Sequence, residues 1–76
     1  MRKIIVNQKI LNGKPIFQGT RIPVEIILDF LTQDYSTEEI IKEYPRLTKD
    51  DIISALKFAT NRIKEEQIYP APLWNF

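Results

Sequence analysis

Apolar side chains recur at helical spacing in the first half of the chain. The repeat at i, i+3, i+4 and i+7, which is the spacing of one buried helix face, is made by Val24, Ile27, Leu28 and Leu31. Ile26 and Phe30 add a second apolar flank, so we expect the helix to be covered on more than one side. Pro23 fits the first helical position, where its missing N–H costs no hydrogen bond. The pattern predicts a helix that starts at Pro23 and ends at Asp34-Tyr35.

Capping signals predict a second, shorter helix. Ser36 and Glu39 form a capping box, in which the Ser36 hydroxyl accepts from the backbone N–H of Glu39 and the Glu39 carboxylate reaches back. Pro45 ends the helix because it excludes Tyr44 from the α region. The apolar positions of this helix are Ile40, Ile41 and Tyr44.

A third and longer helix is predicted from Thr48, which precedes the acidic pair Asp50-Asp51. Thr is a favoured N-cap, and carboxylates are stabilising at the positive end of a helix. The helix is expected to run to about residue 66. Its predicted inward stripe is Ile52, Ala55, Leu56, Ala59 and Ile63.

Residues 3–17 have the pattern of a strand and a hairpin. Residues 4–6 are β-branched, and Asn12-Gly13 separates Ile10-Leu11 from Ile16-Phe17. Asn-Gly tolerates the positive φ angles of a type I′ turn, so we expect a hairpin turn there. Pro15 cannot donate to a ladder, which limits that strand to an edge or to a short length. Because a lone hairpin is only marginally stable, it must pack on the helices or pair with another chain.

The last ten residues differ in character from the rest. Pro70 and Pro72 forbid a helix, so residues 67–76 are predicted to be an extended aromatic tail. The tail either folds back into the core or docks on a partner, and we favour docking because Trp and Tyr are typical binding anchors. That partner is either a second copy or a foreign protein. The candidate partner-binding residues are Ile68, Tyr69, Leu73, Trp74 and Phe76.

A chain of 76 residues has room for one domain, with an arm at 1–23, a three-helix core at 24–66 and a tail at 67–76. A domain this small buries only about 60% of its unfolded surface, so we expect it to associate as a homodimer. The absence of Cys, the short N-terminal apolar run and the lack of a membrane-length apolar segment predict a cytoplasmic protein without a signal peptide or membrane span.

The absence of His and Cys removes the commonest general base, the thiol nucleophile and the usual transition-metal ligands. We therefore predict that the chain is not an enzyme and holds no cofactor or metal. Glu38-Glu39 and Asp50-Asp51 are carboxylate pairs that could bind Mg²⁺, but helix capping explains both pairs directly.

Charge is divided unevenly along the chain. Residues 1–23 carry five basic and no acidic side chains, whereas residues 24–45 carry six acidic side chains and one basic. Such asymmetry suggests a surface that meets an anionic partner. The alternative is that the basic arm and the acidic helices face each other within the molecule.

The short helix, the turn and the long capped helix form a helix-turn-helix candidate, whose second helix would enter the major groove. The turn lacks the usual Gly, and Asp50 and Asp51 would oppose nearby phosphates. The alternative is a three-helix bundle whose charges are only solvated. The candidate DNA contacts are Arg46, Thr48, Lys49, Ser54 and Lys57, with Lys14 and Arg21 on phosphates.

Several of these segments resemble one small prokaryotic family, the domain-of-unknown-function family 433. The resemblance covers residues 13–59 and rests most on Gly-Thr-Arg-Ile-Pro-Val at 19–24, with Gly-Lys-Pro at 13–15 and Tyr-Pro-Arg-Leu-Thr at 44–48. It implies a homeodomain-like helix-turn-helix fold, to which our own reading of residues 1–23 adds an N-terminal β-arm. It also implies an antitoxin that silences a PIN-like ribonuclease toxin and represses its own operon by binding operator DNA.

One departure from the family concerns Asp34, where the family commonly has Gly. We expect the turn to survive, because Asp adopts the left-handed conformation at modest cost. Lys14 and Arg21 match motif positions, but they could equally fix the arm onto the helices. The alternative function is a protein-interaction module that only sequesters a partner and never touches DNA.

Overall fold

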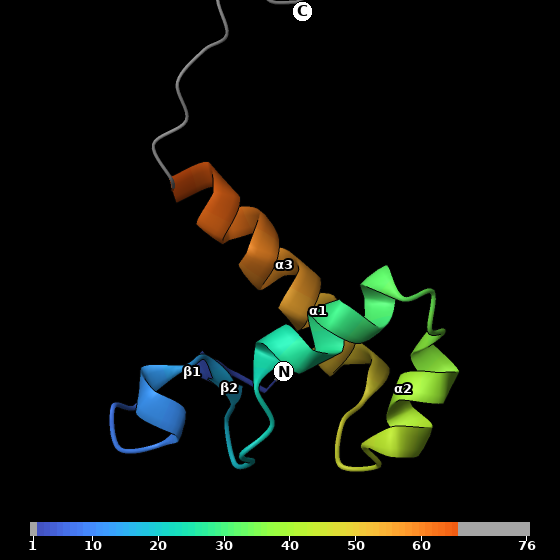
Figure 1. Cartoon of the computed structure of the whole chain (residues 1–76), viewed down its shortest axis with the longest axis horizontal. Coiled ribbons are helices and arrows are strands. Elements are labelled where there is room, and N and C mark those ends of the chain that lie inside the picture. The colour runs from blue at the N-terminus through green and yellow to red at the C-terminus, as the bar shows by residue number, and fades with distance from the viewer. Residues whose placement is uncertain (1, 66–76) are drawn as a thin grey trace, which may run out of the picture.

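The computed structural model describes residues 2–65 and has the predicted mainly α architecture (Figure 1). The N-terminal elements are β1 (Ile4–Ile5), the 3₁₀ turn η1 (Leu11–Gly13) and β2 (Ile16–Phe17), and the helices are α1 (Val24–Thr32), α2 (Thr37–Glu43) and α3 (Lys49–Glu65). Helices α1 and α3 cross at the centre, with the hairpin and α2 on opposite sides of them. The aromatic tail and its five candidate partner-binding residues lie outside the described residues.

The core is assembled from one or two side chains each of β2, α1, α2, the connection between α2 and α3, and α3. It comprises Phe17, Val24, Ile27, Ile40, Leu47, Ile52 and Ala55, with Phe58 and Leu28 among the partly buried side chains packed against it. Burial of each large apolar side chain contributes roughly 1.5–3 kcal/mol. Leu47 belongs to the connection between α2 and α3, so its buried side chain anchors this connection to the core.

Helix α1 begins one residue later than predicted, because Pro23 is its N-cap and Val24 its first residue. The Val24 N–H donates to the carbonyl of Pro15 at 3.0 Å, which ties the start of α1 to the residue before β2. The helix ends at Thr32, and Asp34 has a φ of 69°. The expectation that Asp34 supports a left-handed turn is thus confirmed.

The prediction that Ile10-Leu11 and Ile16-Phe17 flank the hairpin turn is wrong. Strand β1 pairs with β2 in antiparallel register, with Ile4 opposite Phe17 and Ile5 opposite Ile16, whereas Ile10-Leu11 is not a strand. Asn12 and Gly13 have the expected positive φ, but Leu11 has it too. Three such residues in succession coil the chain into a separate turn, and Pro15, which lacks an N–H, stops the ladder from reaching it.

Helix α2 has the predicted capping box. The Glu39 N–H donates to the Ser36 hydroxyl at 3.1 Å, and the Ser36 N–H donates to the Glu39 carboxylate at 3.0 Å. The backbone N–H of Ser36, and to a smaller extent its hydroxyl, hold the pKa of the Glu39 carboxyl below its ordinary value of 4.5. The helix ends before Pro45, as expected.

The inward face of α3 is only partly as predicted. Ile52 and Ala55 are buried, but Leu56 is 48% exposed and Ile63 is 57% exposed. The reason is that the buried stripe is turned toward Asp51 and away from Leu56, because Asp51 itself is buried. Residues 60–65 are all exposed, since a helix of 17 residues extends beyond the elements that cover it. Within residues 2–65, no helix is long and apolar enough to span a membrane.

Asp51 organises the start of α3. Its carboxylate accepts from the Thr48 N–H at 2.8 Å, and its own N–H donates to the Thr48 hydroxyl at 3.3 Å. Its other oxygen lies 3.8 Å from Nε of Arg2, and the side chain is only 3% exposed. A carboxylate can be buried at this depth because its capping bonds and a cation replace the water that it loses.

We expect Asp51→Ala to lower the free energy of unfolding by about 2 kcal/mol, because it removes a cap and leaves Arg2 without its counter-charge. Urea unfolding followed by circular dichroism measures this. The control is Asp50→Ala on the exposed side of the same turn, which should cost about 0.5 kcal/mol or less. Equal losses in the two variants would contradict the role given to Asp51.

We expect acid to weaken the capping box of α2. Because the folded-state pKa of Glu39 is lowered, its stabilising effect is complete above the unfolded-state value and is lost as the pH falls through the folded-state value. Urea midpoints of the wild type and Glu39→Gln should therefore converge between about pH 6 and about pH 3. Glu43→Gln, at the other end of α2, is the control, and a similar convergence there would reject the assignment to Glu39.

Candidate nucleic-acid interface

Arg46, a predicted DNA contact, makes hydrogen bonds within the fold. Its Nη2 donates to the carbonyl of Gly19 at 2.7 Å, and its own carbonyl accepts from Arg2 at 3.1 Å. Gly19 has a φ of 81°, a conformation that favours glycine. The arm, the turn before α1 and the turn before α3 are joined at this point. Arg46 therefore positions the start of α3.

The two predicted phosphate contacts of the arm behave differently. Nζ of Lys14 lies 2.7 Å from Glu25 on α1, and both side chains are more than half exposed. This ion pair fixes the arm to the helix, as the alternative reading proposed, and it contributes at most about 1 kcal/mol at an exposed site. Arg21 is exposed in the turn before α1. No ion pair or hydrogen bond within residues 2–65 involves its guanidinium.

The remaining predicted contacts lie on or beside α3. Thr48 is used as its cap, whereas Lys49 and Lys57 are exposed and Ser54 is half-buried. Burial of Asp51 removes one of the two carboxylates that were expected to repel phosphates, and Asp50 stays exposed. The structure thus leaves Lys49, Lys57 and Arg21 as the predicted cations that are open to an anionic partner.

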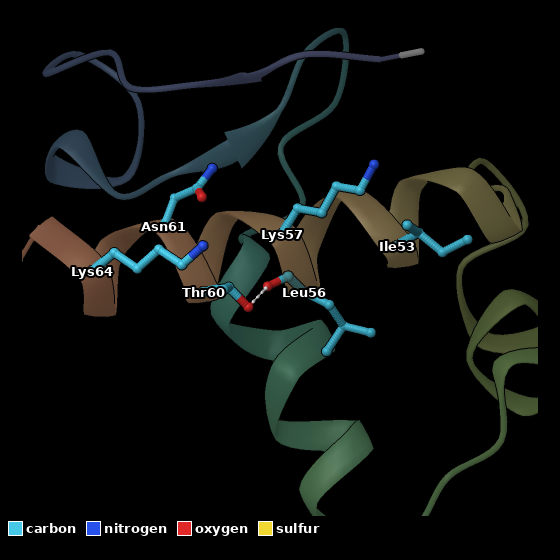
Figure 2. A pocket seen from close by; sticks show the side chains of 6 residues that line it. All are labelled: Ile53, Leu56, Lys57, Thr60, Asn61 and Lys64. Carbon is cyan, nitrogen blue, oxygen red and sulfur yellow. Dashed lines mark hydrogen bonds between the residues drawn. The ribbon is translucent and has the colours of Figure 1, made fainter.

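The side of α3 that points away from the core carries a shallow hollow, which we call the outer face. It is lined by Ile53, Leu56, Lys57, Thr60, Asn61 and Lys64 (Figure 2). The N-terminal strands lie along one side of it and α1 along the other. The Thr60 hydroxyl donates to the Leu56 carbonyl at 2.9 Å, which orients it on the helix.

Of the outer face, the sequence analysis selected only Lys57 as a contact. It placed Leu56 in the core and missed four residues, namely Ile53, Thr60, Asn61 and Lys64. A signal for them was present. With Lys57, these four residues recur at the i, i+4, i+7, i+8 and i+11 spacing of one helix surface. That signal was hidden because Leu56 and Ile63 were assigned to the core, and this assignment placed the exposed surface elsewhere.

A second hollow, which we call the arm hollow, lies between β1 and α3. It is lined by Arg2, Ile4, Ser54, Lys57, Phe58 and Asn61. It shares Lys57 and Asn61 with the outer face, so the two hollows adjoin along this pair. Two predicted contacts, Ser54 and Lys57, are brought together here.

These surfaces combine hydrogen-bonding groups with apolar side chains. Ammonium, amide and hydroxyl groups can hydrogen-bond to base edges and phosphates, and Ile or Leu side chains can contact thymine methyl groups. Within residues 2–65, no three His, Cys, Asp or Glu side chains are grouped so that they could hold a metal ion.

Comparison with known proteins identifies a family. No curated protein and no solved structure gives a significant match to the chain. The model of a family described as "Protein of unknown function (DUF433)" matches residues 4–59. The match includes the hairpin, α1, α2 and α3 as far as Ala59, and it therefore contains the junction at Arg46 and the start of the outer face. The chain belongs to the DUF433 family.

Proposed function

We propose that this protein is an antitoxin-like DNA-binding protein that acts by binding and catalyses no reaction of its own. In this proposal α2, the connection at 44–48 and α3 act as a helix-turn-helix, and the outer face of α3 enters the major groove. The observation that carries the proposal is the spacing of the exposed side chains on α3. The residues that contact bases from the reading helix of a homeodomain recur at i, i+3, i+4 and i+7, the spacing of Ile53, Leu56, Lys57 and Thr60.

The residue types on the outer face support this use. Asn61 can pair with adenine through its amide, and Thr60 can hydrogen-bond to a base edge. Lys57 and Lys64 add positive charge, which attracts the phosphates on either side of the groove. Asp50 is the opposing charge at the start of the same helix, and its carboxylate suits the amino group of cytosine.

The proposed partner protein is a PIN-like ribonuclease, as the resemblance to antitoxins implies. The protein would silence this toxin and, as a homodimer, repress the operon that encodes both. A dimer suits the recognition of an operator, because its two recognition helices would contact two half-sites one helical turn apart.

We expect binding to duplex DNA from upstream of the gene to weaken steeply with salt, because each neutralised phosphate releases counterions. Lys57→Gln should reduce the log–log slope by about 0.9 per contact removed. Asn61→Ala should cost about 1–3 kcal/mol on the specific site and little on random duplex. Fluorescence anisotropy at several salt concentrations measures both effects.

Lys42→Gln, which removes an equal charge from α2, is the matched control and should leave the slope unchanged. No measurable affinity even at low salt would overturn the proposal.

A second candidate function, sequestration of a partner without DNA, is favoured by the apolar part of α3. Ile53, Leu56 and Ile63 are exposed there, and neighbouring exposed apolar side chains on a helix are typical of protein interfaces. Leu56→Ser discriminates between the two functions. Loss of toxin binding with unchanged affinity for the duplex would favour sequestration through this surface. Loss of affinity for the duplex with unchanged toxin binding would favour DNA recognition.

A further inference from the structure

We propose that the arm hollow is a phosphate-binding site. The ligand is a phosphate group, and only its source, a phosphodiester of the DNA backbone, rests on the proposed function. The hollow is lined by two cations, Arg2 and Lys57, and by two neutral donors, Ser54 and Asn61. Among residues 2–65, no carboxylate lines it. Such a set of donors matches an anion that has several acceptor oxygens.

The charge of the hollow comes mainly from Lys57. Arg2 shares its charge with Asp51, whose Oδ1 lies 3.8 Å from Nε. Lys57 is exposed on α3, and no ion pair among residues 2–65 involves it. The hollow therefore keeps close to one unit of positive charge.

The guanidinium of Arg2 has hydrogen-bonding capacity to spare. Its Nη2 donates to the Arg46 carbonyl, while the buried Nη1 has no hydrogen-bond partner among residues 2–65. An unpaired buried donor is costly, and a phosphate oxygen in the hollow that Arg2 lines would be an acceptor for it. Because the Arg46 carbonyl and Asp51 already hold the guanidinium, little side-chain freedom is left to lose on binding.

The apolar lining strengthens the site. Ile4 and Phe58 are partly buried and packed against the core, and they form the part of the hollow that offers no hydrogen bonds. Such surroundings lower the local dielectric, so each interaction between an ammonium or guanidinium and a phosphate is stronger than in open water.

The position of the hollow fits a backbone phosphate. Lys57 and Asn61 line both hollows, and Figure 2 shows them directed toward the N-terminal strands. When a reading helix lies in the major groove, the phosphates border the groove beside it. A site at the edge of the outer face would thus hold the strand next to the bases that the helix reads.

The first test is an NMR titration with inorganic phosphate against chloride at matched ionic strength. We expect saturable shifts of the backbone amides of Ser54, Lys57 and Asn61. Lys57→Gln should weaken the binding about tenfold, as expected for loss of one charge-assisted hydrogen bond. Lys42→Gln, on α2, should leave it unchanged. Shifts that grow without saturating, or an equal response in Lys57→Gln, would overturn the site.

The second test separates the hollow from the proposed function. Ser54→Ala removes a hydroxyl that makes no hydrogen bond within residues 2–65, so the fold should tolerate it. We expect a loss of a few-fold in affinity for every duplex sequence alike, because a phosphate contact carries no sequence information. A sequence-dependent loss would overturn the site. Saturable phosphate binding without duplex binding would keep the site and reject the DNA proposal.

Discussion

The burial of one carboxylate, that of Asp51, determines which side chains of α3 lie on the surface of the molecule. Asp51 caps α3 through Thr48 and lies beside Arg2 of the arm. Because a buried charge must keep its partners, this arrangement fixes both the rotation of α3 about its axis and the position of the arm along it. The identity of the residues on the outer face follows from that rotation. A change at Asp51 would therefore alter the outer face, although Asp51 does not line it.

The parts of the fold that local signals specify were predictable. The capping box at Ser36 and Glu39, the stop at Pro45 and the left-handed Asp34 each depend on chemistry within four residues. The pairing of β1 with β2 was not, because it joins residues that a separate left-handed turn divides. Apolar periodicity also could not show that a polar residue, Asp51, would take a core position and leave Leu56 outside.

The candidate site was predictable only in part for the same reason. Residue type selects Lys49, Ser54 and Lys57 correctly as members of α3, but it cannot show that Arg46 donates to the Gly19 carbonyl across 27 positions of sequence. The basic side chains that make the charge along the chain uneven have two different surroundings in the structure. Lys14 of the arm meets Glu25 of α1, so part of the asymmetry is neutralised within the molecule, while Lys57 and Lys64 stay on the surface.

The projection of α3 past the rest of the fold has a further consequence. Residues 60–65 are all exposed, so their helicity relies mainly on local propensity, which is modest for Thr60 and Asn61. This end of α3 should open at a free energy well below that of global unfolding. A partner that bound to residues 60–65 would have to hold this segment in its helical form. Part of the binding free energy would therefore be used to order the helix.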